Sequence, residues 1–350
     1  MRILLIGNFA PPYEEENLHN FTLLNLLRQE GNDCRVINIS ESRYIGTKED
    51  GIINIKNYLD FMFKFVRHGA GSDVIHFLTK GYTRPGLMKL VTTVALSKLL
   101  LAKSIITLHA EMFSVFGRLR SKMGGQQLLH LSFSLSDKVI CGDKHTCDTA
   151  AMHYKIKDKF AVIPSVIRIP EDIKENELSA LNPMGNKKRV IVFSDIKYPS
   201  LLFDVLNNFL TEYSDSETGF VVSFSEGFSA RLRPIIEKAG HRLASNIVFL
   251  DNPERRLLSI TYANADFVLR SPSCDGRTLF EDIAFVVRRA ARSAGCLHFP
   301  VSILLLKEGD VTSLCAGIFN NILTYKADIL SEPAITMEDY YRRIKDIYSK

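Results

Sequence analysis

The chain has 350 residues, of which 46% are hydrophobic and 24% are charged, so it has enough material for two domains of ordinary size. This composition argues against a disordered chain. Lys and Arg outnumber Asp and Glu by only 44 to 39, which does not resemble the strongly basic balance of a nucleic-acid-binding protein.

The cysteines and the apolar segments indicate a compartment. The six cysteines are scattered without a Cys-x-x-Cys pair or His partners at metal-ligand spacing, which favours a reduced cytoplasm and no metal. The first apolar run is too short for a signal peptide. The longest, Leu87 to Leu101, is interrupted by Lys89 and Lys98 and falls short of the roughly 20 residues of a spanning helix. We therefore expect a cytoplasmic protein that is soluble or lies on the inner face of a membrane.

The first half of the chain alternates short apolar runs with segments of helical length. Arg2 to Ile6 predicts a strand, the loop 7–16 follows, and Leu18, Phe21, Leu24 and Leu27 then recur at helical spacing. Further strands are predicted at Arg35–Ile39, Val74–Phe77, Ser104–His109 and Lys138–Cys141. This alternation predicts a parallel sheet covered by helices.

The second half repeats the pattern after a change in composition. Residues 164–188 are rich in proline and charge and predict a linker. The next strands are predicted at Arg189–Ser194, Gly219–Phe224, Asn246–Leu250, Asp266–Arg270 and Val301–Leu305, and a last helix at Met337–Tyr348. The expected division is a first domain over 1–165, a linker over 166–188, a second domain over 189–335 and a C-terminal helix over 336–350. Two doubly wound α/β domains facing each other across a cleft would bind ligands beyond the carboxyl ends of their strands.

Several segments, taken in order, resemble the family-four retaining glycosyltransferases. They are Gly7-Asn-Phe-Ala-Pro-Pro-Tyr, Asp137-Lys-Val-Ile-Cys, the run 160–170, Asn246-Ile-Val-Phe-Leu, the run 265–276 and the run 340–348. The resemblance implies the GT-B fold, with two Rossmann-like domains, a nucleoside-diphosphate sugar as donor, and no metal or other cofactor.

The resemblance also implies a donor site in the second domain. A departing diphosphate needs cations, and Lys197, after the strand that ends at Ser194, and Arg270, at the end of a later strand, are in position to supply them. Asp275 and Gly276 match the loop that holds the donor sugar hydroxyls. Each residue also has a structural interpretation: an exposed turn lysine, a buried ion pair, or an Asp-Gly turn.

Two positions depart from the family pattern. The acidic residue expected to open a helix and bind the ribose is replaced by Ile283, and a shortened loop would bring Glu281 to that helix start instead. The glycine pair expected after Pro11-Pro12 is replaced by Glu14-Glu15-Glu16, whose charges would repel a diphosphate unless they point outward.

His109 is the predicted catalytic residue of the first domain. It ends a buried-looking strand, and a neutral imidazole can bond a sugar hydroxyl or orient the acceptor near neutral pH. The matching family histidine lies near the transferred sugar, with Glu111 as a weaker second candidate. A purely structural histidine is the alternative.

The segment Tyr58 to Val66 carries several aromatic residues between Lys56 and Arg67, and Arg118, Arg120 and Lys122 form a second basic cluster. This pattern predicts either a helix at a membrane surface or a core helix with snorkelling lysines.

The sequence thus predicts a metal-independent glycosyltransferase, with a glycan or glycolipid acceptor, in surface polysaccharide synthesis. Two alternatives stay open: a non-catalytic GT-B subunit that binds a partner transferase or glycan, and a GT-B epimerase or phosphorylase.

Overall fold

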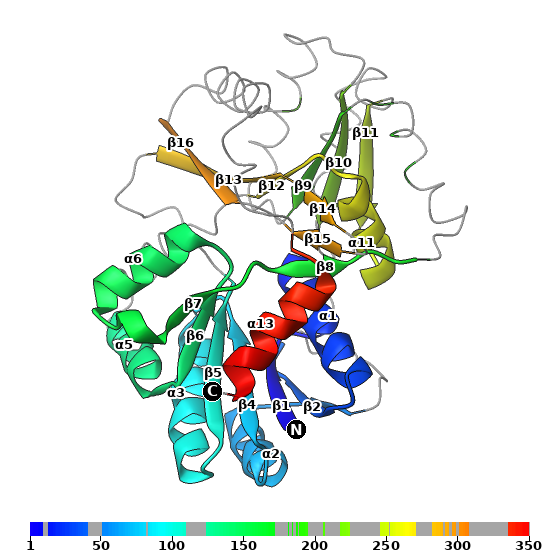
Figure 1. Cartoon of the computed structure of the whole chain (residues 1–350). Helices are drawn as coiled ribbons and strands as arrows, with labels where there is room; N and C mark the ends of the chain where they lie inside the picture. The colour runs from blue at the N-terminus through cyan, green and yellow to red at the C-terminus, as the bar shows by residue number, and fades with distance from the viewer. Residues whose placement is uncertain are drawn as a thin grey trace.

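A computed structural model gives the structure of the chain (Figure 1). It describes residues 1–9, 13–40, 51–81, 83–109, 124–171, 181, 184, 187, 189–194, 206, 218–224, 246–251, 253–270, 282–289, 291–293, 296–298, 301–307 and 335–349.

The first sheet has seven parallel strands in the order β3-β2-β1-β4-β5-β6-β7. They are β1 (Arg2–Gly7), β2 (Asp33–Asn38), β3 (Ile52–Asn54), β4 (Val74–Thr79), β5 (Lys103–Leu108), β6 (Lys138–Cys141) and β7 (Phe160–Val162). The short runs rich in Ile, Val and Leu favour strands buried on both faces, as a parallel sheet requires. The four first-domain strands predicted beyond β1 are confirmed to within one or two residues at their ends.

Helices cover both faces of this sheet. They are α1 (Glu15–Gln29), α2 (Tyr58–Gly69), α3 (Arg84–Leu99), α5 (Gly125–Leu135) and α6 (Lys144–Tyr154), with the short η1 (Lys157–Lys159) before β7. Along β1, Leu4 and Ile6 pack with α2, α3 and α5, whereas Ile3 and Leu5 pack with α1 on the opposite face. Side-chain caps fix three helix starts: Asn57 accepts from the N–H of Asp60, Thr83 from Gly86 and Asp143 from Thr146.

The second sheet has the order β11-β10-β9-β12-β13-β16. Its strands are β9 (Arg189–Ser194), β10 (Thr218–Phe224), β11 (Ile247–Asp251), β12 (Phe267–Arg270), β13 (Asp282–Arg289) and β16 (Val301–Lys307), and α11 (Arg255–Asn264) precedes β12. The first four strands are parallel, whereas β13 runs antiparallel to both β12 and β16.

Strand β13 corrects one sequence prediction. A helix was expected to open at Glu281, but residues 282–289 form a strand in which Ile283 pairs with Leu306. The run Ile-Ala-Phe-Val-Val is rich in β-branched and aromatic residues, which favours a strand over a helix start.

The predicted linker contains a strand. Strand β8 (Val166–Arg168) joins β15 (Cys296–His298) and β14 (Ala291–Ser293) in a small antiparallel sheet. The N–H of Arg168 donates to Thr22 Oγ1 of α1 at 3.1 Å, so this sheet is tied to the first domain. The chain therefore crosses between the domains in an ordered strand.

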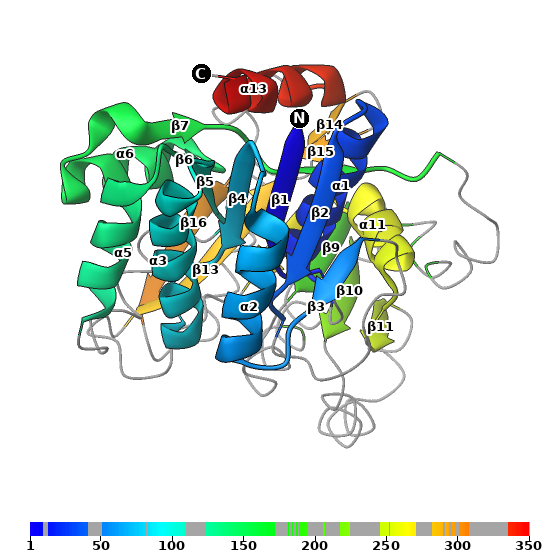
Figure 2. The same cartoon turned by 90° about the horizontal axis from the view of Figure 1, so that it is seen from below.

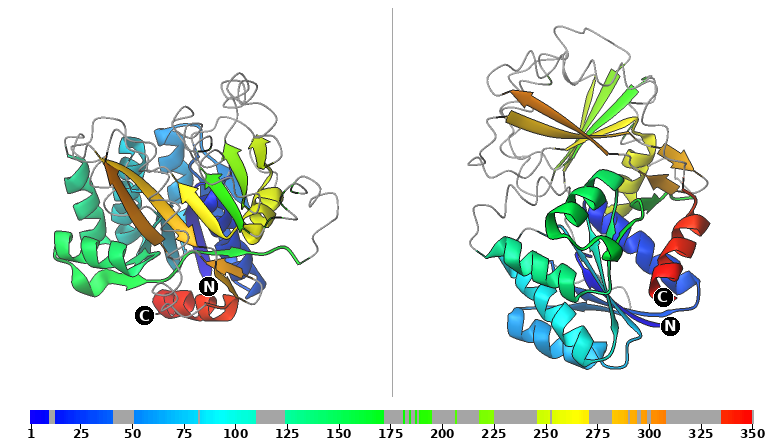
Figure 3. Two further views of the ribbon diagram at one scale, coloured as in Figure 1. Left: turned by 90° about the horizontal axis from the view of Figure 1, so that it is seen from above. Right: turned by 60° about the vertical axis from the view of Figure 1, so that its left-hand side comes forward.

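The last helix, α13 (Met337–Ser349), returns to the first domain and lies beside α1 (Figures 1 and 3). Its buried residues Tyr340, Ile344 and Tyr348 join the core on the α1 face of the first sheet. Helix α1 also contacts the second domain, because Leu18 belongs to the core around α11 and Arg255 lies 4.1 Å over the Phe21 ring. Of the helices that the structure describes, none is long and apolar enough to span a membrane.

Candidate active site

Three neighbouring strands of the first sheet end side by side. Strands β1, β4 and β5 finish at Gly7, Thr79 and Leu108, and the N–H of His109 donates to the Thr79 carbonyl at 2.9 Å. Gly81 follows with a φ of 75°, and a Cβ there would lie 2.8 Å from Leu108 Cδ1, so glycine is required at this turn. Because carboxyl ends of parallel strands gather ligand-binding groups, this edge is where a site is expected.

His109 stands at this edge in a defined orientation. Its ring is half-buried, and its Nε2 lies 3.0 Å from Oδ1 of the buried Asn20 on α1. The Asn20 amide nitrogen donates to the Asn8 carbonyl at 3.1 Å, which fixes the amide so that Oδ1 faces the histidine. An amide oxygen only accepts, so a neutral His109 carries its proton on Nε2 and keeps Nδ1 as the accepting nitrogen.

Gly7 makes room for this pair. A Cβ at Gly7 would lie 3.2 Å from Asn20 Nδ2 and 3.0 Å from Leu78 Cβ. Glycine at the end of β1 therefore lets α1 pack close enough for Asn20 to reach His109.

A second histidine, His19, lies against the first. The His19 and His109 ring centroids are 4.9 Å apart in an edge-to-face arrangement. His19 is buried, with Nδ1 3.1 Å from the backbone nitrogen of Val166 in β8 and Nε2 3.2 Å from the hydroxyl of Tyr340 in α13. Burial lowers the pKa of His19 to about 4, although the Val166 carbonyl, 3.2 Å from Nδ1, acts in the opposite direction because it favours a protonated ring nitrogen, so the ring is neutral at pH 7. His19 thus joins the site to the interdomain strand and to the last helix.

The acidic residues at the start of α1 point inward and are matched by a lysine. Lys80, directly after β4, forms ion pairs with Glu14 and Glu16, the second at 3.5 Å. Glu15 and Glu16 are buried in the first turn of the helix, where the positive end of the helix dipole favours carboxylates. The sequence left open an outward orientation, a contact of this loop with the acceptor, or a disturbed site; the structure pairs two of these carboxylates with Lys80.

This arrangement predicts a large stability loss on removing Lys80. Lys80→Ala would remove a positive charge from beside the almost fully buried Glu16 carboxylate, and we expect the free energy of unfolding to fall by about 3 kcal/mol. Adding Glu16→Gln should recover a large part of that loss, because the buried charge is then gone. Urea unfolding of the two variants checks this, and a single variant as stable as wild type would contradict it.

Of the donor-site residues predicted from the sequence, the structure describes only Arg270. Arg270 is the last residue of β12 and pairs with Ser194 at the end of β9, so its backbone lies at the expected strand end. Lys197, Asp275, Gly276 and Glu281 lie outside the described residues, as do Glu111 and the basic cluster over 118–122. Their roles stay predictions.

The arrangement of the two sheets is similar to that of several solved structures that share one fold. The structure is similar to HepE from Anabaena in complex with UDP and glucose, with a TM-score of 0.52, 15% identity, and coverage of 77% of this chain and 73% of that one. It is similar to sucrose-phosphate synthase from Thermosynechococcus elongatus, with a TM-score of 0.53, 11% identity, and coverage of 76% and 74%. The chain has the GT-B fold.

A third similar structure is that of a different class of enzyme, an epimerase. A putative UDP-N-acetylglucosamine 2-epimerase from Listeria monocytogenes aligns with a TM-score of 0.53 and 12% identity over 78% of this chain and 74% of that one. No protein-family model matches the chain, and no curated protein matches it in sequence. At these identities the likeness establishes the fold and leaves the reaction to be argued from residues.

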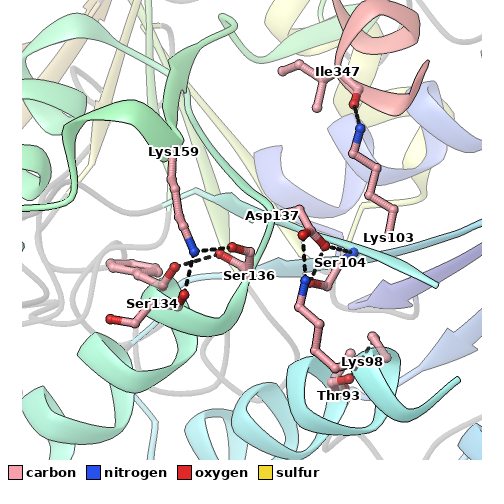
Figure 4. Close-up of polar contacts among 11 residues, drawn as sticks. Thr93, Lys98, Lys103, Ser104, Ser134, Ser136, Asp137, Lys159 and Ile347 are labelled. Carbon is pink, nitrogen blue, oxygen red and sulfur yellow. Dashed lines mark hydrogen bonds and ion pairs between the residues drawn. The ribbon is translucent and has the colours of Figure 1, made fainter. Parts of the chain in front are cut away.

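A hollow of about 530 Å³ lies at the opposite, amino edge of the first sheet. It is lined by Lys98, Leu101, Ala102, Lys103, Asp137 and Lys138. Figure 4 shows how its charged groups are used: Lys98 contacts Asp137, which also accepts from Ser104, and Lys103 donates to the Ile347 carbonyl at the end of α13. These contacts hold the sheet edge and the last helix together, so we do not place the donor site there.

Three residues of the site were not predicted from the sequence. Asn20 and His19 were hidden inside a helix predicted only from its apolar spacing, and no local pattern distinguishes them. Lys80 carried a usable signal, because it directly follows a buried strand whose carboxyl end lies at the same edge as that of β5.

Proposed function

We propose that this chain is a retaining glycosyltransferase that takes its sugar from a nucleoside diphosphate, with His109 on the sugar and acceptor side. The observation that carries the proposal is the position of His109. Its ring is fixed by Asn20 at the carboxyl edge of the first sheet, in a fold whose similar structures include one bound to UDP and glucose.

The geometry of His109 gives it a defined chemical role. A neutral ring that donates Nε2–H to Asn20 has Nδ1 as its accepting nitrogen, and we propose that a sugar or acceptor hydroxyl donates to Nδ1 when substrate binds. Its orientation is fixed before substrate binds, because Asn20 is itself held by the Asn8 carbonyl. Such preorganisation lowers the cost of reaching the transition state.

The donor would be held by the second domain. Lys197 and Arg270 would neutralise the leaving diphosphate, Asp275 and Gly276 would bind the sugar hydroxyls, and Glu281 would contact the ribose. Because β13 begins at Asp282, Glu281 would act from the position just before a strand and not from a helix start. We expect this chemistry to need no metal, with cations of the chain doing that work.

We propose that the acceptor is a glycan or glycolipid used in surface polysaccharide synthesis. We place the enzyme in the cytoplasm, at the inner face of the membrane where lipid-linked acceptors are presented. Its partners would then be the donor, the acceptor and the lipid surface, and not a nucleic acid.

An epimerase is the second candidate, favoured by the similarity to the Listeria structure. Proton NMR distinguishes the transferase from the epimerase. UDP-sugars are incubated with the purified protein, with and without a lipid-linked glycan fraction, and their signals are followed over time. The proposal predicts release of UDP and a new α-anomeric signal that require the acceptor, starting from an α-linked donor. Conversion of the donor to its epimer, or to free sugar, without any acceptor would contradict transfer.

A further inference from the structure

Helix α2 carries an apolar face that it does not turn toward the core. Phe61 and Phe65 are fully buried against the first sheet. Leu59, Phe63 and Val66 recur at i, i+4 and i+7 and therefore share another face of the helix, where they are 79%, 66% and 48% exposed. The helix is thus apolar on two faces, and only one of them is used by the fold.

The exposed face continues onto the neighbouring helix. Figure 2 shows α2 and α3 side by side on the outside of the first sheet. The exposed Tyr58 places its hydroxyl 2.5 Å from Thr92 Oγ1 of α3, and the exposed Met88 lies one turn before Thr92. We call Tyr58, Leu59, Phe63, Val66 and Met88 the outer patch.

Cations border the outer patch. Lys56 and Arg67 are exposed at the two ends of α2, and Lys64 lies between them along the helix. The single acidic residue of α2, Asp60, is bonded to the Lys64 ammonium at 2.8 Å and to the Lys56 N–H at 2.7 Å. The border is therefore net positive.

The pKa of His68, which lies near Arg67, also indicates a positive potential at this end of α2. The pKa of His68 is lowered first by burial and then by the positive charges of Arg67, Arg35 and Lys64. Nearby cations disfavour the protonated imidazole, and the same potential attracts anionic groups outside the protein.

We propose that the outer patch docks this protein onto an anionic lipid bilayer. Exposed Leu, Phe and Val side chains gain free energy by leaving water at the headgroup level, while a cationic border meets lipid phosphates. A two-fold dimer through the same patch is disfavoured, because it would bring Lys56 and Arg67 of one copy toward their equivalents in the other. Docking through the outer patch would not depend on which reaction the active site catalyses.

Vesicle sedimentation tests this proposal directly. The full chain is incubated with vesicles of phosphatidylcholine alone or of equimolar phosphatidylcholine and phosphatidylglycerol. We expect binding to the anionic vesicles, weakened by added salt, and a partition coefficient at least about tenfold lower for the variant Leu59→Ser/Phe63→Ser/Val66→Ser. The matched control is Leu99→Ser/Leu101→Ser, which removes two exposed leucines near Lys98 and Lys103 and should bind as wild type does.

Three results would overturn the proposal. These are no binding of wild type to anionic vesicles, an equal loss in the control, or self-association of wild type that the α2 variant abolishes without any vesicle binding. Circular dichroism melts exclude misfolding as the cause of a loss. Titration of UDP into the α2 variant separates this test from the proposed reaction, because neither outcome of the lipid experiment alters the expected donor binding.

Discussion

Replacing His109 by Ala is expected to lower the kcat of sugar transfer by about two orders of magnitude, within the range for a positioned acid, base or hydrogen-bonding group. The ring is held by Asn20 Oδ1 at 3.0 Å, so its removal takes away a preorganised acceptor at the strand end. Stability should change little, because the side chain is only half-buried. Initial rates with saturating donor, measured on both proteins, check the effect.

The control for this experiment is His145→Ala, which removes an exposed histidine of α6. It should leave kcat unchanged. Full activity of His109→Ala would assign the histidine a structural role and remove the central residue of the proposed site.

Asn20 is a positioning residue whose effect is readable in the pH profile. Asn20→Asp would place a carboxylate beside Nε2–H and raise the pKa of His109, since a nearby negative charge stabilises imidazolium. The pH at which activity is half-lost on the acid side should then move upward. A variant that loses activity with an unchanged pH profile would indicate only a structural role for Asn20.

The second large effect is a loss of stability between pH 6.5 and pH 4. Burial lowers the pKa of His76 to about 3, with a smaller contribution from His19, and burial lowers the pKa of His19 itself to about 4. Both values lie below the 6.5 of an unfolded chain, so the unfolded state binds more protons in this window. The stability that comes from keeping His19 and His76 neutral is fully present above pH 6.5. It is lost as the pH falls toward the pKa values that the two histidines have in the folded chain.

The size of this stability loss follows from the protons that His19 and His76 take up on unfolding. Around pH 5 the unfolded chain holds nearly two more protons at these sites than the folded chain, which corresponds to a slope of about 2.5 kcal/mol per pH unit. His76 is bonded to the Tyr348 hydroxyl at 2.6 Å and to Thr107 Oγ1 at 2.7 Å, so protonation also disturbs the attachment of α13.

Urea unfolding at several pH values measures this slope. In His76→Gln it should fall to about half, because one titrating group is gone. His145→Gln, at an exposed position, should leave the slope as it is in wild type. A wild-type stability that is flat between pH 6.5 and pH 4.5 would contradict the account of buried neutral histidines.

The fold class could be predicted from the sequence, because parallel strands that are buried on both faces leave continuous apolar runs in the chain. The structure confirms this prediction. The runs at Lys138–Cys141 and Arg189–Ser194 are strands with those bounds. Strand β8 could not be predicted, because its partners in β15 lie far along the chain and three residues carry too little pattern. Strand β13 was wrongly expected to open as a helix, because the family comparison outweighed its β-branched residues.

The site was predictable only where a residue ends a strand. His109 directly follows β5, and Arg270 ends β12, so the strand pattern alone indicates their edge of each sheet. Asn20 and His19 reach the site through the packing of α1 against the sheet, which depends on Gly7 and on contacts with β8 and α13. Such long-range contacts have no signature in local spacing.

The most direct test of the central claim is calorimetric titration of UDP, other nucleoside diphosphates and their sugars into the metal-free protein. The account predicts binding of one diphosphate at about micromolar Kd, and binding at least about tenfold weaker in Arg270→Ala. In Asp275→Ala only the sugar-bearing ligand should bind more weakly. Absence of binding across the whole panel would contradict a donor site and support a non-catalytic GT-B subunit.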